Sequence, residues 1–95
     1  MTQRTALVTG VVGGIGAAIA TRLAADGATV VVSDVPGDAL NAAADTLGLP
    51  ALPADLGDPS AVQDMAWQLL RDHAAPDILI NAAGGGRGQV GTPLE

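Results

Sequence analysis

Glycines are concentrated near the start of the chain, where four of them fall within the seven residues 10–16. A short apolar run precedes this stretch and a helical pattern follows it. A glycine-rich turn between a strand and a helix is how proteins bind the pyrophosphate of a dinucleotide. In such a turn Gly10 allows a sharp bend, Gly14 lets backbone N–H groups approach a phosphate, and Gly16 lets the helix pack tightly. The residues therefore predict a nucleotide-binding turn.

Asp34 is the second candidate, 18 residues after Gly16 and at the end of the β-branched run 29–32. A carboxylate at the carboxyl end of the second strand can accept hydrogen bonds from the 2′- and 3′-hydroxyls of an adenosine ribose, and it repels a 2′-phosphate. No Arg or Lys stands in the turn or just after Asp34 to hold such a phosphate. This arrangement favours NAD over NADP. The alternative is a solvated aspartate at a strand end.

Asp55 and Leu56 follow the expected third strand, at the same edge of the sheet. Asp55 could accept a hydrogen bond from the adenine amino group, and Leu56 could pack against the ring. An aspartate in a turn before the next helix is equally compatible with the sequence.

The single histidine and the single tryptophan both fall in the helix expected over 59–73. His73 lies at the C-terminal end of this helix, at the sheet edge opposite the ligand crevice, where a helix end favours a cation for electrostatic reasons. We expect no catalytic role for it. Trp67 lies off the main apolar stripe, and the sequence leaves open whether it packs at the helix flank or against a partner.

Alternating strands and helices must position these candidates. Strands are predicted at 5–9, 28–33, 49–54 and 78–80, and helices at 15–26, 39–47 and 59–73. Asp38 and Asp58 are expected to cap the second and third helices, and Gly48 to end the second. Pro50 and Pro53 weigh against the third strand.

This alternation implies a parallel sheet with right-handed crossovers. We predict a partial, doubly wound α/β fold of the Rossmann type, with four strands in the order 3-2-1-4. Two helices should cover one face and the third helix the other. Strands one and four should then expose apolar surface beside the third helix, and strand four, although its apolar run is typical of a buried strand, should form an open edge.

Composition excludes several other classes of protein. A chain of 95 residues with 48% hydrophobic residues is one small domain or part of a larger one. A net charge of −6 argues against nucleic-acid binding, which needs a basic face. The absence of cysteine, with a single histidine, argues against disulfides and a zinc site. We therefore predict no metal.

The N-terminal stretch has one other interpretation. Arg4 and the apolar residues 6–20, which end in Ala18-Ile19-Ala20, resemble a secretory signal peptide. A signal core is rarely interrupted by a phosphate-loop pattern of glycines, and the stretch is too short and too rich in glycine to span a bilayer. We therefore expect a cytoplasmic protein with no membrane partner.

The order and spacing of these motifs resemble the classical short-chain dehydrogenase/reductase family. The segment Thr9-Gly10-x-x-x-Gly14-Ile15-Gly16 looks like the family's cofactor motif, and Asp34 matches its NAD-selecting acidic residue. Asp55-Leu56 resembles its adenine-contacting pair. Residues 77–84 are similar to the strand-four motif that usually ends Asn-Asn-Ala-Gly, with Ala82 in place of the second Asn.

The resemblance implies a set of cofactor-binding residues. They are Gly10, Gly14, Ile15, Gly16, Asp34, Asp55, Leu56, Asn81 and Gly84. Asn81 is assigned to a contact between the sheet and the cofactor. The chain would be a partial NAD(P)-binding Rossmann domain over residues 1–95, with a flexible glycine-rich segment over 84–95.

Catalytic residues cannot be carried over from the family. Its Ser and its Tyr-x-x-x-Lys motif come later, on the fifth strand and fifth helix of a domain of about 250 residues. There the Tyr exchanges the proton, the Lys lowers its pKa and holds the nicotinamide ribose, and the Ser orients the substrate. This chain has no Tyr and no Lys, and Ser33 and Ser60 lie in the wrong elements.

Three hypotheses fit the missing Tyr and Lys; we take the first as the origin of the chain and leave its present activity open. The chain is the front part of an NAD-dependent oxidoreductase, truncated or split, which interconverts alcohols and carbonyls by hydride transfer. Alternatively it is a catalytically inactive nucleotide-binding module that self-associates through its bare sheet face and edge, or a remnant that barely folds. The expected partners are a dinucleotide and either a second copy or a complementing C-terminal part.

Overall fold

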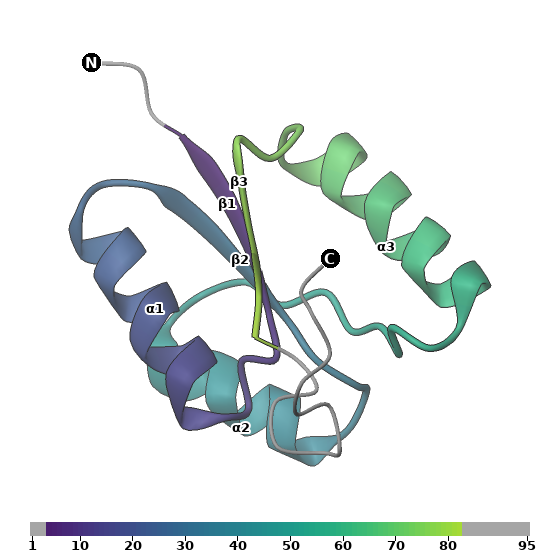
Figure 1. Ribbon diagram of the computed structural model, residues 1–95, viewed down its shortest axis with the longest axis horizontal. Coiled ribbons are helices and arrows are strands. Elements are labelled where there is room, and N and C mark those ends of the chain that lie inside the picture. The colour runs from purple at the N-terminus through teal and green to yellow at the C-terminus, as the bar shows by residue number, and fades with distance from the viewer. Residues whose placement is uncertain (1–3, 83–95) are drawn as a thin grey trace, which may run out of the picture.

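A computed structural model describes residues 4–82, and these form three parallel strands and three helices (Figure 1). The elements are β1 (Thr5–Thr9), α1 (Gly14–Ala25), β2 (Thr29–Ser33), α2 (Asp38–Leu47), α3 (Pro59–Asp72) and β3 (Ile78–Asn81). The sheet order is β2-β1-β3, with Thr5 opposite Thr29 and Thr9 opposite Asn81. The predicted Rossmann-like α/β fold with three helices is confirmed.

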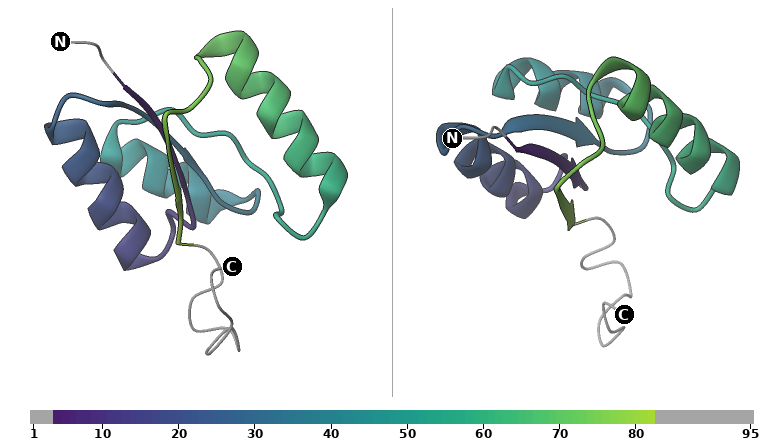
Figure 2. Two further views of the ribbon diagram at one scale, coloured as in Figure 1. Left: turned by 45° about the horizontal axis from the view of Figure 1, so that its top comes forward. Right: turned by 90° about the horizontal axis from the view of Figure 1, so that it is seen from above.

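The helices cover the two faces of the sheet as predicted (Figures 1 and 2). Successive residues of a strand point to opposite faces. On one face, Val8 and Val32 pack in a core with Ala20 of α1 and Leu40 of α2. On the other face α3 is the one helix, and it packs together with the segment 49–54; the buried members of that core are Leu7, Val31, Leu52, Ala54, Met65 and Leu69.

The predicted strand at 49–54 is wrong, and with it the four-stranded order 3-2-1-4. The segment lies beside β2 but contributes a single bridge, between Val32 and Ala51. Its hydrogen bonds run from Val32 N to Pro50 O (2.9 Å), from Leu52 N to Val32 O (2.9 Å) and from Ala54 N to Asp34 O (3.0 Å). Alternate residues thus face β2, and at position 50 the donor is missing because proline has no N–H.

The helix ends follow the predicted chemistry at two of three positions. The Asp58 carboxylate accepts a hydrogen bond from Ser60 N (3.0 Å) at the start of α3, and Gly48 ends α2 in the left-handed conformation, with φ of 69°. The predicted Asp38 cap is wrong. Asp38 is itself the first residue of α2, after Gly37, and no side chain caps this helix. Its charge still lies where the helix dipole favours an anion.

β3 is more exposed than a strand buried on both faces. Ile78 and Ile80 pack against the α1 side of the core, whereas Leu79 points to the other face and is 64% exposed. Leu7 of β1 is only 5% exposed because α3 covers it. The expectation of exposed apolar surface therefore holds for β3 and is wrong for β1. Within the described residues, β3 pairs with β1 alone.

Membrane spans require long apolar helices, of about 20 residues. Among residues 4–82, no helix reaches the length and apolarity that a span needs.

Candidate functional site

The parallel strands bring most of the sequence candidates to one edge of the sheet. The glycine turn follows β1, Asp34 follows β2 and Asn81 ends β3. Because the strands are parallel, their carboxyl ends lie at one edge of the sheet, the lower end of the strands in Figure 1. Asp55 follows the segment 49–54 that lies beside β2. Gly84 and the segment 84–95 fall outside the described residues. In open α/β sheets ligands bind at this carboxyl edge.

The glycine turn is held by a hydrogen bond from each of three successive N–H groups. Gly10 has a φ of 75°, a left-handed conformation that favours glycine. Val11 N donates to Ser33 O (3.2 Å) and Gly13 N to Gly10 O (3.2 Å). Val12 N donates to the Oδ2 atom of Asp34 (2.9 Å). The turn is therefore tied to the end of β2 at two points.

Gly14 and Gly16 meet very different surroundings. A Cβ atom on Gly16 would clash with the carbonyl oxygen of Gly10 and lie 2.9 Å from its carbonyl carbon. A Cβ atom on Gly14 would meet no atom within 4 Å. The packing of the described residues therefore explains the glycine at 16 and gives no reason for the one at 14. An open approach at Gly14 suits a ligand that comes close to the backbone.

The start of α1 offers three backbone donors. The N-cap is Gly13, which has no side chain to accept from the first turn, and that turn carries no acidic residue. Ala17 N makes the first helical bond, to Gly13 O (3.1 Å). Within residues 4–82, the N–H groups of Gly14, Ile15 and Gly16 have no acceptor. Such groups, with the helix dipole, form a site that fits the pyrophosphate of a dinucleotide.

Asp34 holds its carboxylate beside the turn with both oxygens engaged. Oδ2 accepts from Val12 N (2.9 Å) and Oδ1 accepts from Val35 N (2.8 Å). The side chain is half-buried. An ionised carboxylate has about four lone-pair positions, so each oxygen keeps one for a further donor such as a hydroxyl.

Asp55 takes part in a local turn. Its Oδ1 atom accepts from Gly57 N (2.9 Å), and its carbonyl oxygen accepts from Asp58 N (2.9 Å). This is the turn chemistry that the sequence left open as an alternative. Leu56 is 39% exposed and lines a cavity beside α3.

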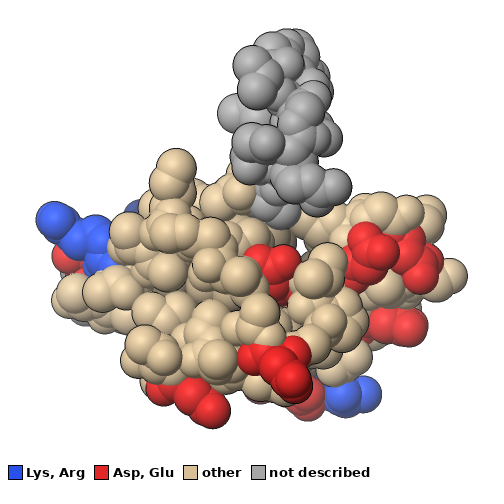
Figure 3. Space-filling view, turned by 90° about the horizontal axis from the view of Figure 1, so that it is seen from below, with Lys and Arg blue, Asp and Glu red and all other residues tan. Residues whose placement is uncertain are grey.

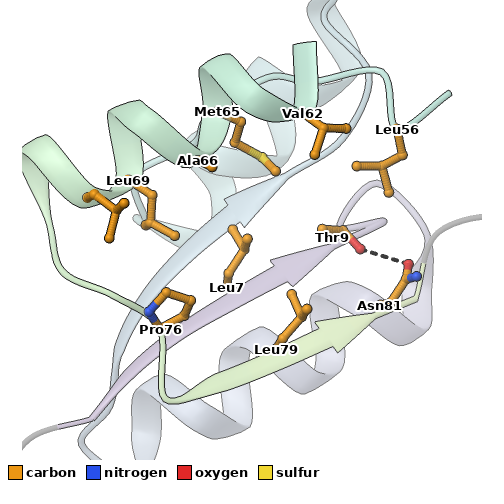
Figure 4. Close-up of a pocket in the computed structure, with 11 residues that line it drawn as sticks. Leu7, Thr9, Leu56, Val62, Met65, Ala66, Leu69, Pro76, Leu79 and Asn81 are labelled. Carbon is orange, nitrogen blue, oxygen red and sulfur yellow. Dashed lines mark hydrogen bonds between the residues drawn. The ribbon is translucent and has the colours of Figure 1, made fainter. Parts of the chain in front are cut away.

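Thr9 and Asn81 join β1 to β3 through their side chains. The Thr9 hydroxyl donates to the Oδ1 atom of Asn81 (3.0 Å) and lies 3.4 Å from Ile80 O (Figure 4). Thr9 is 4% exposed. Because the oxygen of the Asn81 amide accepts this bond, its NH2 group remains available as a donor at the carboxyl edge.

A cavity of about 350 Å³ lies between α3 and the β1–β3 half of the sheet (Figure 4). Its lining is apolar except for Thr9 and Asn81 at one end; the other members are Leu7, Leu56, Val62, Met65, Ala66, Leu69, Leu70, Pro76 and Leu79. Sequence reasoning did not predict it. The sequence signals were the apolar stripe of α3 and the apolar surface expected on the strands beside it.

The charged side chains visible at this edge are mainly acidic. Figure 3 looks onto it from below and shows acidic groups at several separate places and basic groups only towards the margins. His73 ends α3, and in Figure 1 this helix end lies near the start of β3, away from the glycine turn. Within residues 4–82, no cluster of His, Asp or Glu side chains could hold a metal ion.

Comparisons with known proteins agree with this geometry. The profile of the family described as short chain dehydrogenase matches residues 4–94. The chain is 43% identical over 95 residues to the 1-deoxy-11-beta-hydroxypentalenate dehydrogenase of Streptomyces avermitilis. This alignment covers 95% of this chain and 35% of that protein.

Solved structures show the same relationship. The menthone neomenthol reductase from Mentha piperita superposes with a TM-score of 0.83 and 29% identity, over 88% of this chain and 32% of that one. The L-sorbose reductase from Gluconobacter frateurii, solved with NADPH and L-sorbose, gives a TM-score of 0.76 and 32% identity, over 88% of this chain and 34% of that one. The chain thus spans about a third of the length of these relatives. It belongs to the short-chain dehydrogenase family and corresponds to the N-terminal portion of its members.

Proposed function

We propose that this chain binds the adenosine diphosphate half of NAD, as the cofactor-binding part of an oxidoreductase that interconverts alcohols and carbonyls. The observation that carries this proposal is the pairing of two features at one edge. Three N–H groups at the start of α1 have no acceptor within residues 4–82, and the Asp34 carboxylate is held beside the same turn. The first feature suits a pyrophosphate and the second a ribose diol.

The preference for NAD rests on charge at Asp34. A 2′-phosphate placed at the ribose position would lie against this carboxylate, and like charges at short range repel strongly. No Arg or Lys occurs in residues 9–16 or directly after Asp34 to offset the repulsion. The related L-sorbose reductase was solved with NADPH, so membership of the family does not determine the choice.

The chain lacks the groups that would complete the reaction. The bound dinucleotide would exchange a hydride with the substrate, and an alkoxide formed in this way needs a proton donor and electrostatic stabilisation. The chain has no Tyr and no Lys, and we assign no catalytic residue to it. We therefore propose that turnover and substrate choice depend on the remaining two thirds of the family domain.

Calorimetric titration of the folded 95-residue chain with NAD, ADP and NADP tests the proposal. We expect saturable binding of NAD and ADP and none of NADP. Gly14→Val should abolish binding with little effect on folding, because the space at Gly14 is open. Asp34→Ala should weaken the binding of NAD and ADP, and Asp45→Asn is its control for lost charge, since Asp45 is exposed on α2. A folded chain that binds none of the three ligands would contradict the proposal.

A second proposal concerns the cavity beside α3. Leu79 is 64% exposed, Leu70 is 52% exposed, and β3 has one unpaired edge among the described strands. Monomeric proteins rarely leave apolar surface and a strand edge open together. Since the chain spans about a third of its relatives, we propose that the rest of the family domain covers this surface.

Analytical sedimentation, which gives the stoichiometry of a complex, tests this second proposal. A mixture of the chain with a fragment carrying the rest of the domain of the Streptomyces avermitilis relative should form a one-to-one complex, and Leu79→Lys should weaken it. Trp67→Lys is the control, because Trp67 is 65% exposed on α3 and does not line the cavity. A stable homodimer of the chain that Leu79→Lys dissociates would instead support the self-associating binding module.

A further inference from the structure

The bond between Val12 and Asp34 differs from the other two that hold the glycine turn. Val11 N and Gly13 N both donate to backbone carbonyls, of Ser33 and Gly10. Val12 N donates to a side chain, over 22 residues of sequence. The conformation of the turn is therefore coupled to the identity of residue 34, which backbone bonds alone would not require.

The Asp34 carboxylate is held in one orientation by its two donors. Val35 N donates to Oδ1 at 2.8 Å and Val12 N to Oδ2 at 2.9 Å. Rotation of the carboxylate about its last bond would break both hydrogen bonds together. The valines that supply the two N–H groups expose about half of their surface, 46% for Val12 and 53% for Val35, so they flank the carboxylate without burying it.

We propose that Asp34 is a positioning residue for the glycine turn, in addition to the ribose contact on which the proposed function rests. By accepting from Val12 N, it fixes the turn two residues before Gly14 and thereby sets the direction of the unpartnered N–H groups of α1. The Asp34 carboxylate then serves both parts of the ligand: it orients the donors for the anion at α1, and it binds the ribose. The turn is preorganised before any ligand arrives, which lowers the cost of binding.

Asparagine cannot replace this carboxylate. Its amide has one oxygen and one NH2 group, so only one of the two backbone N–H groups would find an acceptor. The other would face a donor. Asp34→Asn therefore keeps the shape of the side chain and loses one of two bonds, whereas Asp34→Ala loses both.

Amide hydrogen exchange in the ligand-free 95-residue chain measures the bond directly. We expect the Val12 amide to exchange about tenfold faster in Asp34→Ala, since the loss of one such bond changes local opening by this order. In Asp34→Asn one amide oxygen serves one of the two N–H groups, so either the Val12 or the Val35 amide should exchange faster. The reference within each sample is the amide of Val31, a fully buried residue of β2. Asp45→Asn is the matched control and should leave both amides unchanged.

The comparison between the two amides distinguishes a local effect at Val12 from a general loss of stability, which would also accelerate Val31. If Asp34→Ala accelerates Val12 and Val31 equally, Asp34→Asn decides, because it preserves the shape of the side chain. Selective acceleration of Val12 in either variant, or of Val35 in Asp34→Asn, supports the proposal. If Asp34→Ala does not accelerate Val12 more than Val31, and Asp34→Asn accelerates neither Val12 nor Val35 more than Val31, the proposal is overturned.

Titration with ADP and with 2′,3′-dideoxy-ADP separates positioning from ribose contact. The dideoxy ligand has no ribose hydroxyl to offer Asp34. If Asp34 also positions the turn, Asp34→Ala weakens both ligands, by about threefold or more for the dideoxy ligand. Loss of a nearby negative charge works in the opposite direction, towards tighter anion binding.

An unchanged or tighter affinity for the dideoxy ligand, with weaker ADP binding, would leave Asp34 as a ribose contact only and overturn the positioning role in binding. If the unaltered chain binds neither ligand, the proposed function fails. The exchange experiment still decides whether Asp34 holds the turn.

Discussion

The Thr9 hydroxyl donates to the Asn81 amide oxygen at 3.0 Å and so joins the carboxyl ends of β1 and β3. The two residues are direct neighbours in the parallel register, and Ala82 N continues the ladder by donating to Thr9 O at 3.2 Å. The pair lies at the polar end of the cavity beside α3 (Figure 4). It holds the edge strand β3 at the point where its last side chain enters the candidate site.

Thr9→Val is expected to lower the free energy of unfolding by about 1 kcal/mol, the usual net value of one such hydrogen bond. The change keeps the shape of a side chain that is 4% exposed. Urea unfolding followed by circular dichroism measures the loss. Thr9→Ser keeps the hydroxyl and should recover the bond, although it removes a buried methyl group. Equal unfolding midpoints for Thr9→Val and the unaltered chain would show that the bond contributes nothing to stability.

Gly16→Ala should be strongly destabilising and Gly14→Ala should not. A Cβ atom at 16 would meet the Gly10 carbonyl, and the turn and α1 would have to separate, at a cost of about 1–3 kcal/mol. A Cβ atom at 14 meets open space, and alanine favours the helix over glycine by about 0.5–1 kcal/mol. Thermal unfolding of the two variants gives the comparison. A similar loss of stability in both would mean that the close approach at Gly16 is not what requires glycine.

Much of the fold could be predicted because the chain marks its elements locally. Each signal depends on a few neighbouring residues. The structure has the end of β2 just before Asp34, the end of α2 at Gly48 and the start of α3 at Asp58-Pro59. The prediction of a third strand was wrong because Pro50 lacks an N–H group at a position that faces β2. The residues that face β2 are determined by the register of the two segments, which the sequence pattern does not reveal.

The position of the candidate site could be predicted from the sequence, but the hydrogen bonds within it could not. The rule that parallel strands end at one edge was enough to place Asp34 near the glycine turn. The bond to Val12 depends on how the turn bends back over the end of β2, across 22 residues. The exposure predicted for the fourth strand is confirmed by Leu79, because α3 is the one helix on that face, whereas the burial of Leu7 depends on where α3 lies over the sheet, which the sequence pattern does not give.

Asp58→Ala should destabilise the chain by about 1 kcal/mol, because α3 then loses the acceptor for Ser60 N at its first turn. The matched variant is Asp64→Ala, which removes an exposed aspartate of the same helix, after its first turn. The difference between the two urea midpoints isolates the cap from the loss of charge. If Asp64→Ala were as destabilising as Asp58→Ala, the charge on α3 and not the cap would be the cause.

The pKa of Asp72 is expected below its ordinary value of 3.8, chiefly because the exposed Arg71 guanidinium donates a hydrogen bond to the carboxylate. A carboxyl whose pKa is lowered by folding stabilises the folded state above its unfolded pKa, and this contribution is lost as the pH falls through the lowered folded value. The effect is small because both side chains are exposed. NMR titration of the Asp72 carboxyl carbon, below pH 5, measures the shift directly. Arg71→Gln should raise the pKa towards the ordinary value, and high salt should narrow the difference between the two proteins, because ions screen exposed charges. An Asp72 pKa that Arg71→Gln leaves unchanged would rule out the ion pair as its cause.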